Sequence, residues 1–386
     1  MSGYQTDAAR IQERGQRRAK QGLSRWAGRL GLSRFSGLYI WAGFILLFGI
    51  LTPDTFLTSK TLTSVGSEQA ITGILAIGVL FPLSAGVFDL SAAQNLGLAA
   101  VGSGWLMSQV HVSPLLAIAL TLGFGALIGT ANGFLVTIIG VNSFITTLGM
   151  TSVLLAIAEG IANGNYFGPF PNSFSNLTSG SPLGIPIVVI YLFVAAGVAW
   201  YVLEHTPVGR RLHACGANKE AARLTGVPTR RYIFLSFVAC GVIASASGVL
   251  LSSQLGSVSQ TIGPSYLLPA YAACFLGTTQ LKPERFNVWG TMIALYLLAT
   301  GVEGLQLVGA QLWVTDLFNG AALIGAVSIA VVSERRRAHV ETAAPEPSES
   351  EVAKLEKPRT ESTPVLPNQS RREESKDAVE RETSTR

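Results

Sequence analysis

Few ionisable side chains interrupt the apolar stretches of this sequence, and two carboxylic acids stand out among them. Asp89 lies where an apolar run breaks, close to Ser91, and Glu303 lies inside the run Ala299–Leu305. Ionisable groups within apolar segments of membrane length are costly and usually face a cavity. Both carboxylates are therefore candidates for contacting a polar solute or for coupling its movement to protons or ions. Asp89 or Ser91 could equally cap the helix that follows, and its N-terminal N–H groups could also face a cavity.

Further candidate residues lie at the start of a later apolar run, within Val141–Gly149, and one lies just after Ser91. Asn commonly caps a helix, and small or hydroxylated side chains let helices approach closely, so a structural role is the simpler alternative. On the wall of a path, the same amides and hydroxyls could hydrogen-bond a passing solute. The candidate path residues are Asp89, Ser91, Asn95, Asn142, Phe144, Thr146, Thr147 and Glu303.

The sequence lacks the motifs of nucleotide, metal and nucleophile chemistry. It contains no G-x-x-x-x-G-K-[ST] phosphate loop, no H-E-x-x-H or C-x-x-C pair and no G-x-S-x-G nucleophile elbow. Its 4 His are scattered and its 3 Cys suggest no disulfide framework. We therefore expect no catalytic residue, no metal site and no cofactor bound by this chain. A transporter, a channel or a subunit of one fits better than a membrane enzyme.

The elements that must position these residues are membrane-spanning helices. The 386 residues are 48% hydrophobic and 13% charged, whereas a soluble domain is about 25% charged, which argues against a cytosolic enzyme or a nucleic-acid-binding protein. A spanning helix needs about 20 mainly apolar residues and satisfies its own backbone groups in lipid. We predict an all-α polytopic membrane protein. Its ten expected spans are roughly 38–57, 69–88, 93–110, 114–137, 144–162, 185–203, 232–253, 265–279, 288–307 and 312–332.

The distribution of Lys and Arg predicts the orientation, because cytoplasmic flanks are enriched in both. With ten spans and an inside N-terminus, every basic stretch falls inside and the uncharged stretch 163–184 falls outside. Both termini are then cytoplasmic, and the N-terminal segment is not expected to be a cleaved signal peptide. Residues 334–386 contain no aromatic residue and are expected to be disordered. The expected parts are a basic arm (1–37), a transmembrane domain (38–333) with a cytoplasmic loop (204–231), and a cytoplasmic tail (334–386).

Two of the expected spans, 93–110 and 265–279, are short or polar. They lie five spans apart and would cross the membrane in opposite directions. Short or interrupted helices at corresponding positions of two halves are typical of transporters built from inverted repeats, with a site near the midplane. This pair suggests an inverted repeat with interrupted helices near the centre of the bundle.

The cytoplasmic loop contains a short segment with both ends of a helix marked. Asn218 is a good N-cap, and Gly226 can supply the left-handed residue that ends a helix. Glu220 near the start and Arg223 near the end suit the helix dipole. A helix of about two turns is not stable alone in water, so it needs a surface to pack on: the bilayer, its own membrane domain or a partner. The segment comprises Asn218, Lys219, Glu220, Ala221, Ala222, Arg223, Leu224, Thr225 and Gly226.

This loop resembles the cytoplasmic loop of permease subunits of ATP-binding-cassette importers. The similar stretch is T-P-V-G-R-R-L-H-A-C-G-A-N-K-E-A-A-R-L-T-G-V, from Thr206 to Val227. The resemblance covers about residues 38–333 and points to the ribose and xylose branch of the branched-chain amino acid and monosaccharide permease family. Two departures are A-G-V-F-D-L-S in place of the family's G-G-I-D-L-S, and Glu303 where the sugar branch usually has Asn. Other similar stretches are Ser84–Ser91, Val141–Gly149 and Gly301–Gly309.

The resemblance implies a coupling helix at Asn218–Gly226 that docks on a separate ATPase subunit, which would bind ATP and Mg. It also implies a second, identical permease subunit, an extracytoplasmic solute-binding protein and a location in the bacterial cytoplasmic membrane, in contact with lipid and not with nucleic acid. The expected solute is a monosaccharide, with nucleosides and polyols as alternatives. A stand-alone secondary transporter or facilitator, in which Asp89 and Glu303 couple protons or ions, is the alternative function.

Overall fold

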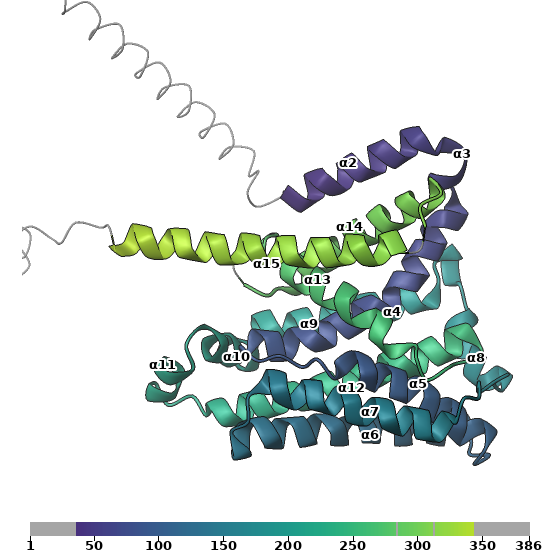
Figure 1. Cartoon of the computed structure of the whole chain (residues 1–386), viewed down its shortest axis with the longest axis horizontal. Coiled ribbons are helices and arrows are strands. Elements are labelled where there is room, and N and C mark those ends of the chain that lie inside the picture. The colour runs from purple at the N-terminus through teal and green to yellow at the C-terminus, as the bar shows by residue number, and fades with distance from the viewer. Residues whose placement is uncertain (1–35, 283–284, 312, 343–386) are drawn as a thin grey trace, which may run out of the picture. The chain divides into compact units, whose positions relative to one another are not determined.

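The computed structural model describes residues 36–282, 285–311 and 313–342, which form helices joined by short connections (Figure 1). These ranges contain no β-strand and one isolated bridge, between Phe167 and Val258. The expected all-α class is thus confirmed for the described residues. The first elements are α2 (Ser36–Leu51), α3 (Pro53–Phe56), α4 (Ser59–Ser84), α5 (Ala92–Ser108), α6 (Pro114–Phe134), η1 (Leu135–Ile139), α7 (Ser143–Ala162), α8 (Asn172–Ser179) and η2 (Pro182–Gly184). The later ones are α9 (Ile187–Trp200), η3 (Tyr201–His205), α10 (Pro207–Ala217), α11 (Lys219–Leu224), α12 (Thr229–Leu255), η4 (Gly263–Tyr266), α13 (Leu267–Gly277), α14 (Val288–Leu307) and α15 (Trp313–Thr342).

A helix lies at each of the ten positions expected to span a membrane. Six helical segments of the described chain are long and apolar enough to do so, and α2 is a shorter apolar helix. Multiple membrane crossings are therefore supported, while the number ten stays a prediction. The six segments are Ser59–Ser84, Pro114–Ile139, Ser143–Ala162, Ile187–His205, Thr229–Leu255 and Val288–Leu307.

Two boundaries differ from the prediction. The second span was expected from residue 69, but α4 begins at Ser59, where the Thr58 hydroxyl accepts a hydrogen bond from the Thr61 amide at 3.2 Å and caps the helix. Polar side chains in its first turns lower the hydropathy there and hide this start. α15 continues to Thr342, past the end of the last expected span at residue 332, and the disorder of the tail stays a prediction. Most of the basic arm and residues 343–386 lie outside the described residues.

α12 lies at the centre of the bundle and contacts α4, α5 and α6. Its crossing with α6 depends on small residues. A Cβ on Gly129 would overlap the Phe237 carbonyl group, and one on Gly241 would overlap the carbonyl of Gly125. Small residues let two membrane helices approach until their backbones touch, which maximises van der Waals contact where lipid offers no hydrophobic driving force.

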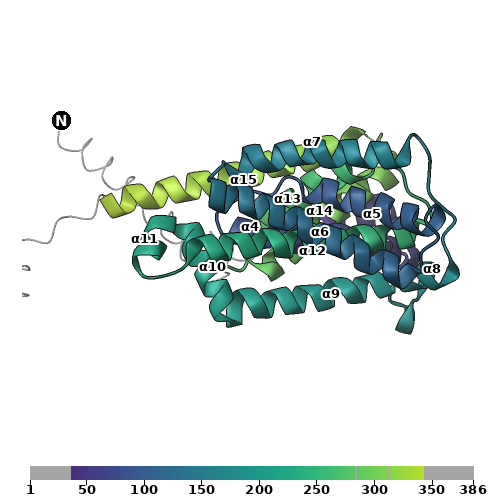
Figure 2. The same cartoon turned by 90° about the horizontal axis from the view of Figure 1, so that it is seen from below.

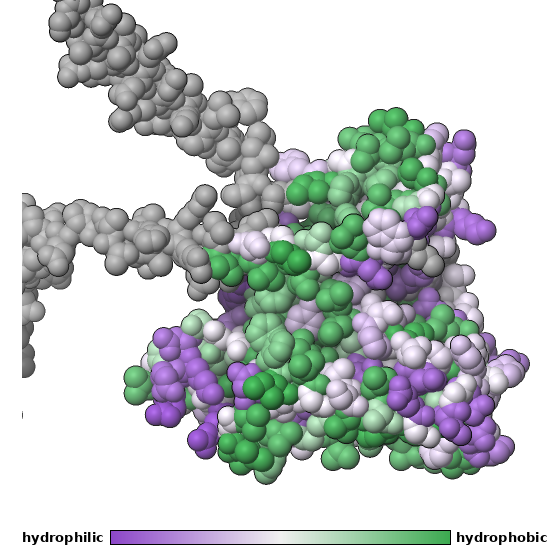
Figure 3. All heavy atoms as spheres, in the orientation of Figure 1, coloured by the Kyte–Doolittle hydropathy of each residue, from purple (hydrophilic) through white to green (hydrophobic). Residues whose placement is uncertain are grey.

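Several outer helices expose large apolar side chains. Only 28% of the apolar window of Pro114–Ile139 and 17% of that of Ser143–Ala162 are buried. Leu127 and Ile145 are 60% and 66% exposed. Hydrophilic residues gather instead towards the end that carries α10 and α11 and towards the end that carries α8 (Figure 3). An apolar band between two polar ends is the pattern of a protein surrounded by lipid.

The helices α6, α7, α9 and α12 run roughly alongside one another between these two ends, in both views of the molecule (Figures 1 and 2). The end with α10 and α11 is called the coupling end below. The other is called the α8 end, where the Ser253 hydroxyl of α12 donates to the Phe174 carbonyl of α8 at 2.7 Å.

Candidate functional site

The short helix α11 forms as the sequence predicts. The Asn218 side chain accepts a hydrogen bond from the Ala221 amide at 3.0 Å, which confirms the N-cap. Gly226 adopts φ +84°, and the Val227 amide donates to the Ala222 carbonyl at 3.1 Å, which closes the C-terminal end. Local capping signals therefore determine both ends of this helix.

α11 offers a largely uncovered surface. Within Lys219–Leu224 only Ala222 is buried, and Leu224 is 84% exposed. Glu220 and Arg223 pair at 3.6 Å, but both side chains are mostly solvated, so the pair adds little to stability. The exposed surface of α11 thus combines one apolar side chain with two solvated charges.

α10 connects α11 to the membrane bundle through a backbone contact. A Cβ on Gly86, which has φ +76°, would lie 3.0 Å from the Cα of Gly216, and a Cβ on Gly216 would overlap the Ser84 carbonyl oxygen. The end of α10 thus rests on the end of α4 and the turn that follows it. In this contact the backbone of Gly216 lies directly against the backbone of Ser84 and Gly86.

The turn begins the interrupted segment, residues 85–91, between α4 and α5. α7 holds this segment by its hydroxyl groups. The Phe88 amide donates to the Ser143 hydroxyl at 3.3 Å, the Leu90 amide donates to the Thr147 hydroxyl at 3.1 Å, and the Thr151 hydroxyl donates to the Leu90 carbonyl at 3.2 Å. These bonds satisfy backbone groups that have no partner within a helix. Such bonds are needed inside a membrane because no water is present there to replace them.

Asp89 lies within the interrupted segment and is only 2% exposed. Its Oδ1 accepts from the amide and the hydroxyl of Ser91 at 3.2 and 2.6 Å and from the Asn132 side chain at 3.5 Å. The Asp89 amide donates to the Tyr271 hydroxyl at 3.1 Å. These four residues, called the Asp89 cluster, join the start of α5 to α6 and α13.

The Asp89 cluster keeps some unused hydrogen-bonding capacity. Asn132 Oδ1 is buried without a partner among the described residues, and so is Ser84 Oγ at the end of α4. Buried polar atoms are nearly always hydrogen-bonded in folded proteins, so these two atoms suit water or a polar solute. Sequence reasoning missed Asn132, whose only signal is a lone amide near the C-terminal end of an apolar span.

The other predicted path residues lie in different surroundings. Asn142 caps α7 by accepting from the amide of Phe144 at 2.9 Å, and Thr146 donates to the Asn142 carbonyl at 2.9 Å. Phe144 is 51% exposed. Asn95 links α5 to α12 by donating to the Gly241 carbonyl at 2.9 Å. The structure therefore brings Asp89, Ser91 and Thr147 together around the interrupted segment, with Asn142 at the start of the same helix α7.

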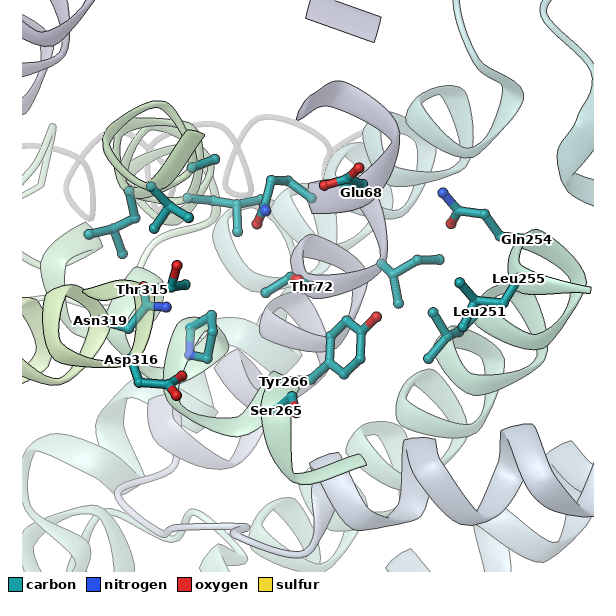
Figure 4. A pocket seen from close by; sticks show the side chains of 17 residues that line it. Glu68, Thr72, Leu251, Gln254, Leu255, Ser265, Tyr266, Thr315, Asp316 and Asn319 are labelled. Atoms are coloured by element: carbon teal, nitrogen blue, oxygen red, sulfur yellow. The ribbon is translucent and has the colours of Figure 1, made fainter. Parts of the chain in front are cut away.

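Glu303 does not belong to this group. It is half-buried on α14 and interacts electrostatically with Glu68 of α4, a residue that sequence reasoning missed because the span was expected to begin after it. Glu68 lines a cavity of about 440 Å³ between α4, α12, α14, α15 and η4 (Figure 4).

A cleft of about 590 Å³ separates the coupling loop from the start of α7. Gly86 and Asn142 line it on the bundle side, and Asn218 and Lys219 on the other. The cap of α11 and the cap of α7 thus face the same space at the coupling end.

Nearby, burial and the positive charges of Arg285 and Lys282 lower the pKa of His213 from 6.5 to about 4, against the opposing effect of Glu204. His213 on α10 is therefore neutral at physiological pH. Glu204 pairs with Lys282, which ties the end of η3 to the connection after α13. Among the described residues, no group of three His, Cys, Asp or Glu side chains could hold a metal ion.

The described chain has several apolar helices long enough to cross a membrane, a buried polar cluster beside an interrupted segment, and an exposed, capped helix at one end. Together these features indicate a multi-pass membrane transport protein. The chain belongs to the family described as branched-chain amino acid transport system / permease component, whose model matches residues 62–327. It is accordingly a membrane permease component of a transport system and not an enzyme, and as a component it works with further subunits.

Curated relatives match most of the chain. It is 32% identical to the ribose import permease protein RbsC of Bacillus subtilis over 309 residues, which cover 79% of this chain and 93% of the relative. It is 30% identical to the autoinducer 2 import system permease protein LsrD of Photorhabdus temperata, covering 73% and 86%. It is 28% identical to the D-allose transport system permease protein AlsC of Escherichia coli, covering 77% and 91%. No solved structure gives a significant match.

Proposed function

We propose that this chain is the membrane-spanning subunit of an ATP-driven, binding-protein-dependent importer, and that its solute is a monosaccharide. The names of two similar proteins, the ribose and the D-allose permease, support the solute class. The exposed, capped helix α11 is the observation that carries the coupling. A separate ATPase subunit binds ATP and Mg, and this chain binds neither.

In this proposal the chain crosses the membrane ten times, and both termini and the coupling end face the cytoplasm. The α8 end then faces outward, where a solute-binding protein delivers the solute. A second, identical permease subunit completes the path. The basic stretch from α10 to the first turn of α12, which contains Arg210, Arg230 and Arg231, supports the cytoplasmic assignment of the coupling end.

The ATPase grips Asn218–Gly226 and moves α10 with it. Because Gly216 rests on Ser84 and Gly86, the movement reaches the interrupted segment 85–91. From there it reaches α7 through Thr147 and, through Asp89, the helices α5, α6 and α13. The ATPase must contact α11 differently in the two membrane states, since only such a difference shifts their equilibrium.

The path residues follow from the same arrangement. Asp89, Ser91, Asn95, Asn142, Phe144, Thr146, Thr147 and Glu303 remain our proposed path residues. The unpartnered oxygen of Asn132, whose amide nitrogen bonds Asp89 and Ser91, supports a polar path beside the Asp89 cluster. A neutral solute that both donates and accepts hydrogen bonds matches such a surface.

Replacing Leu224 tests the docking of α11. Burying a Leu side chain contributes about 1.5–3 kcal/mol, so Leu224→Glu should weaken ATPase binding about tenfold or more. The fold should tolerate the change because the side chain is 84% exposed. The matched control is Leu183→Glu, at a fully exposed Leu of the α8 end.

The assay is copurification of the ATPase with the full-length chain, together with ATP-dependent solute uptake into proteoliposomes. Leu224→Glu should lower both, whereas Leu183→Glu should leave copurification of the ATPase unchanged. Unchanged copurification and uptake in Leu224→Glu would remove the docking role. Uptake against a gradient without any ATPase would instead support a secondary transporter that uses Asp89 and Glu303.

A further inference from the structure

The cavity at the α8 end is lined by polar groups that the protein itself leaves without partners. Thr72 and Asn319 are 4% and 7% exposed, and neither side chain has a hydrogen-bond partner among the described residues. Gln254 Oε1 is buried and also unpartnered. The three come from α4, α15 and α12, and Figure 4 shows them around one open space. A buried polar atom without a partner, such as Gln254 Oε1, requires a ligand or ordered water, and the free groups of Thr72 and Asn319 can contact the same molecule.

The cavity has the size and the wall of a small-molecule site. Its volume of about 440 Å³ lies within the range of ligand pockets, about 300–1,000 Å³. Leu251 and Leu295 supply apolar surface, and the ring of Tyr266 adds an aromatic face with a hydroxyl group. Apolar walls with a few convergent polar groups are typical of sites that orient one small solute.

The charges of the lining indicate which solute fits. Glu68 and Asp316 are exposed, and none of the described lining residues is Lys, Arg or His. Carboxylates accept hydrogen bonds from hydroxyl groups and repel phosphates and carboxylates. The buried groups, Thr72 and Asn319, are neutral and both donate and accept.

We propose that this cavity is a binding site within a single subunit for a neutral polyhydroxylated solute. Glu68 and Asp316 accept from its hydroxyl groups near the opening, and Thr72, Asn319 and Gln254 bind it more deeply. Phosphorylated and acidic sugars are excluded. The inference rests on the proposed function for its solute class, and it places a solute station on the outward side, apart from the Asp89 cluster.

The test introduces a reporter thiol as Thr72→Cys. Because Thr72 is almost completely buried, a water-soluble thiol reagent can reach it only through the cavity. The control is Thr261→Cys, at an exposed residue next to η4 that does not line the cavity. The unaltered chain, whose three cysteines are buried, gives the background labelling.

Full-length protein in lipid nanodiscs, without ATPase or binding protein, is labelled with a cationic or an anionic methanethiosulfonate. The cationic reagent should label Thr72→Cys several-fold faster, relative to Thr261→Cys. Adding Glu68→Gln and Asp316→Asn should abolish this preference. D-ribose, D-xylose, D-allose and myo-inositol are then tested for protection, with D-ribose 5-phosphate as the anionic control and choline as the cationic one.

A neutral solute that fits should slow labelling of Thr72→Cys about tenfold at a concentration about ten times its Kd. It should leave Thr261→Cys unaffected, and the phosphate should not protect. No labelling of Thr72→Cys, protection by choline alone, or protection by none of the neutral compounds would each overturn the inference. If no neutral compound slows the labelling of Thr72→Cys but the full importer takes up solute with ATP, only this site is refuted. If a sugar slows the labelling but no ATP-dependent uptake occurs, the importer function is refuted instead.

Discussion

Gly216→Ala tests whether α10 drives the interrupted segment. The added methyl group would overlap the Ser84 carbonyl and press on the Gly86 backbone, and neither can rotate away as a flexible side chain would. Overpacking of this kind costs about 1–3 kcal/mol. If this cost falls on only one of the two conformations of the membrane domain, the ratio of their populations shifts by about 5–150-fold.

We expect Gly216→Ala to insert into the membrane and to bind the ATPase, because α11 and its caps are unaffected. ATP-driven uptake should fall about fivefold or more, and ATP hydrolysis should respond less to the presence of solute. The measurement is parallel ATP hydrolysis and solute uptake in proteoliposomes containing the full importer.

The matched control is Gly197→Ala on α9, where an added Cβ meets nothing within 4 Å. Ala also favours a helix over Gly by about 1 kcal/mol, so this variant should be at least as stable as the parent and fully active. Uptake at parental rates in Gly216→Ala, with normal insertion, would show that the backbone contact transmits no movement.

Two further predictions concern single residues. Asp89→Ala leaves the buried donors of Ser91 and Asn132 without this acceptor, at about 1–3 kcal/mol for each unsatisfied group. Solute uptake should fall about tenfold with membrane insertion retained, whereas Asp54→Ala on the exposed helix α3 should have no effect. Unchanged uptake kinetics in Asp89→Ala would refute the path role. The pKa of His213 is lowered to about 4 in the fold, so the folded state takes up its proton less readily than the unfolded state. The contribution of neutral His213 to stability is complete above pH 6.5 and is lost as the pH falls towards 4. Thermal unfolding should show that the free energy of unfolding falls by about 1–2 kcal/mol at pH 5, and His213→Gln should remove this fall. Equal acid sensitivity of the variant and the parent protein would contradict the lowered pKa of His213.

Local signals in the chain make α11 predictable from its amino acids alone. Asn218 and Gly226 lie at its two ends, and each acts through bonds to residues only a few positions away. The cap of α7 by Asn142 is open to the same reasoning. Capping depends on chain neighbours, so one sequence is enough to reveal it.

The packing-dependent features are not predictable in this way. Asn132 meets Asp89 across 43 positions of sequence, and nothing near Asn132 indicates that partner. Glu68 and Thr72 line a cavity with Asn319, but the polar first turns of α4 conceal the true start of that helix. The packing of the whole bundle decides which faces of two distant helices meet. The hydropathy of the sequence does not reveal this pairing.

The close crossing of α6 and α12 limits how this protein can change shape. Backbone lies against backbone at Gly129 and Gly241, and the Asn95 side chain hydrogen-bonds α5 to the Gly241 carbonyl of α12. From these contacts we expect α5, α6 and α12 to move together when the protein changes shape. Opening and closing would then occur at the edges of this group, where residues 85–91 separate α5 from α4 without forming a helix.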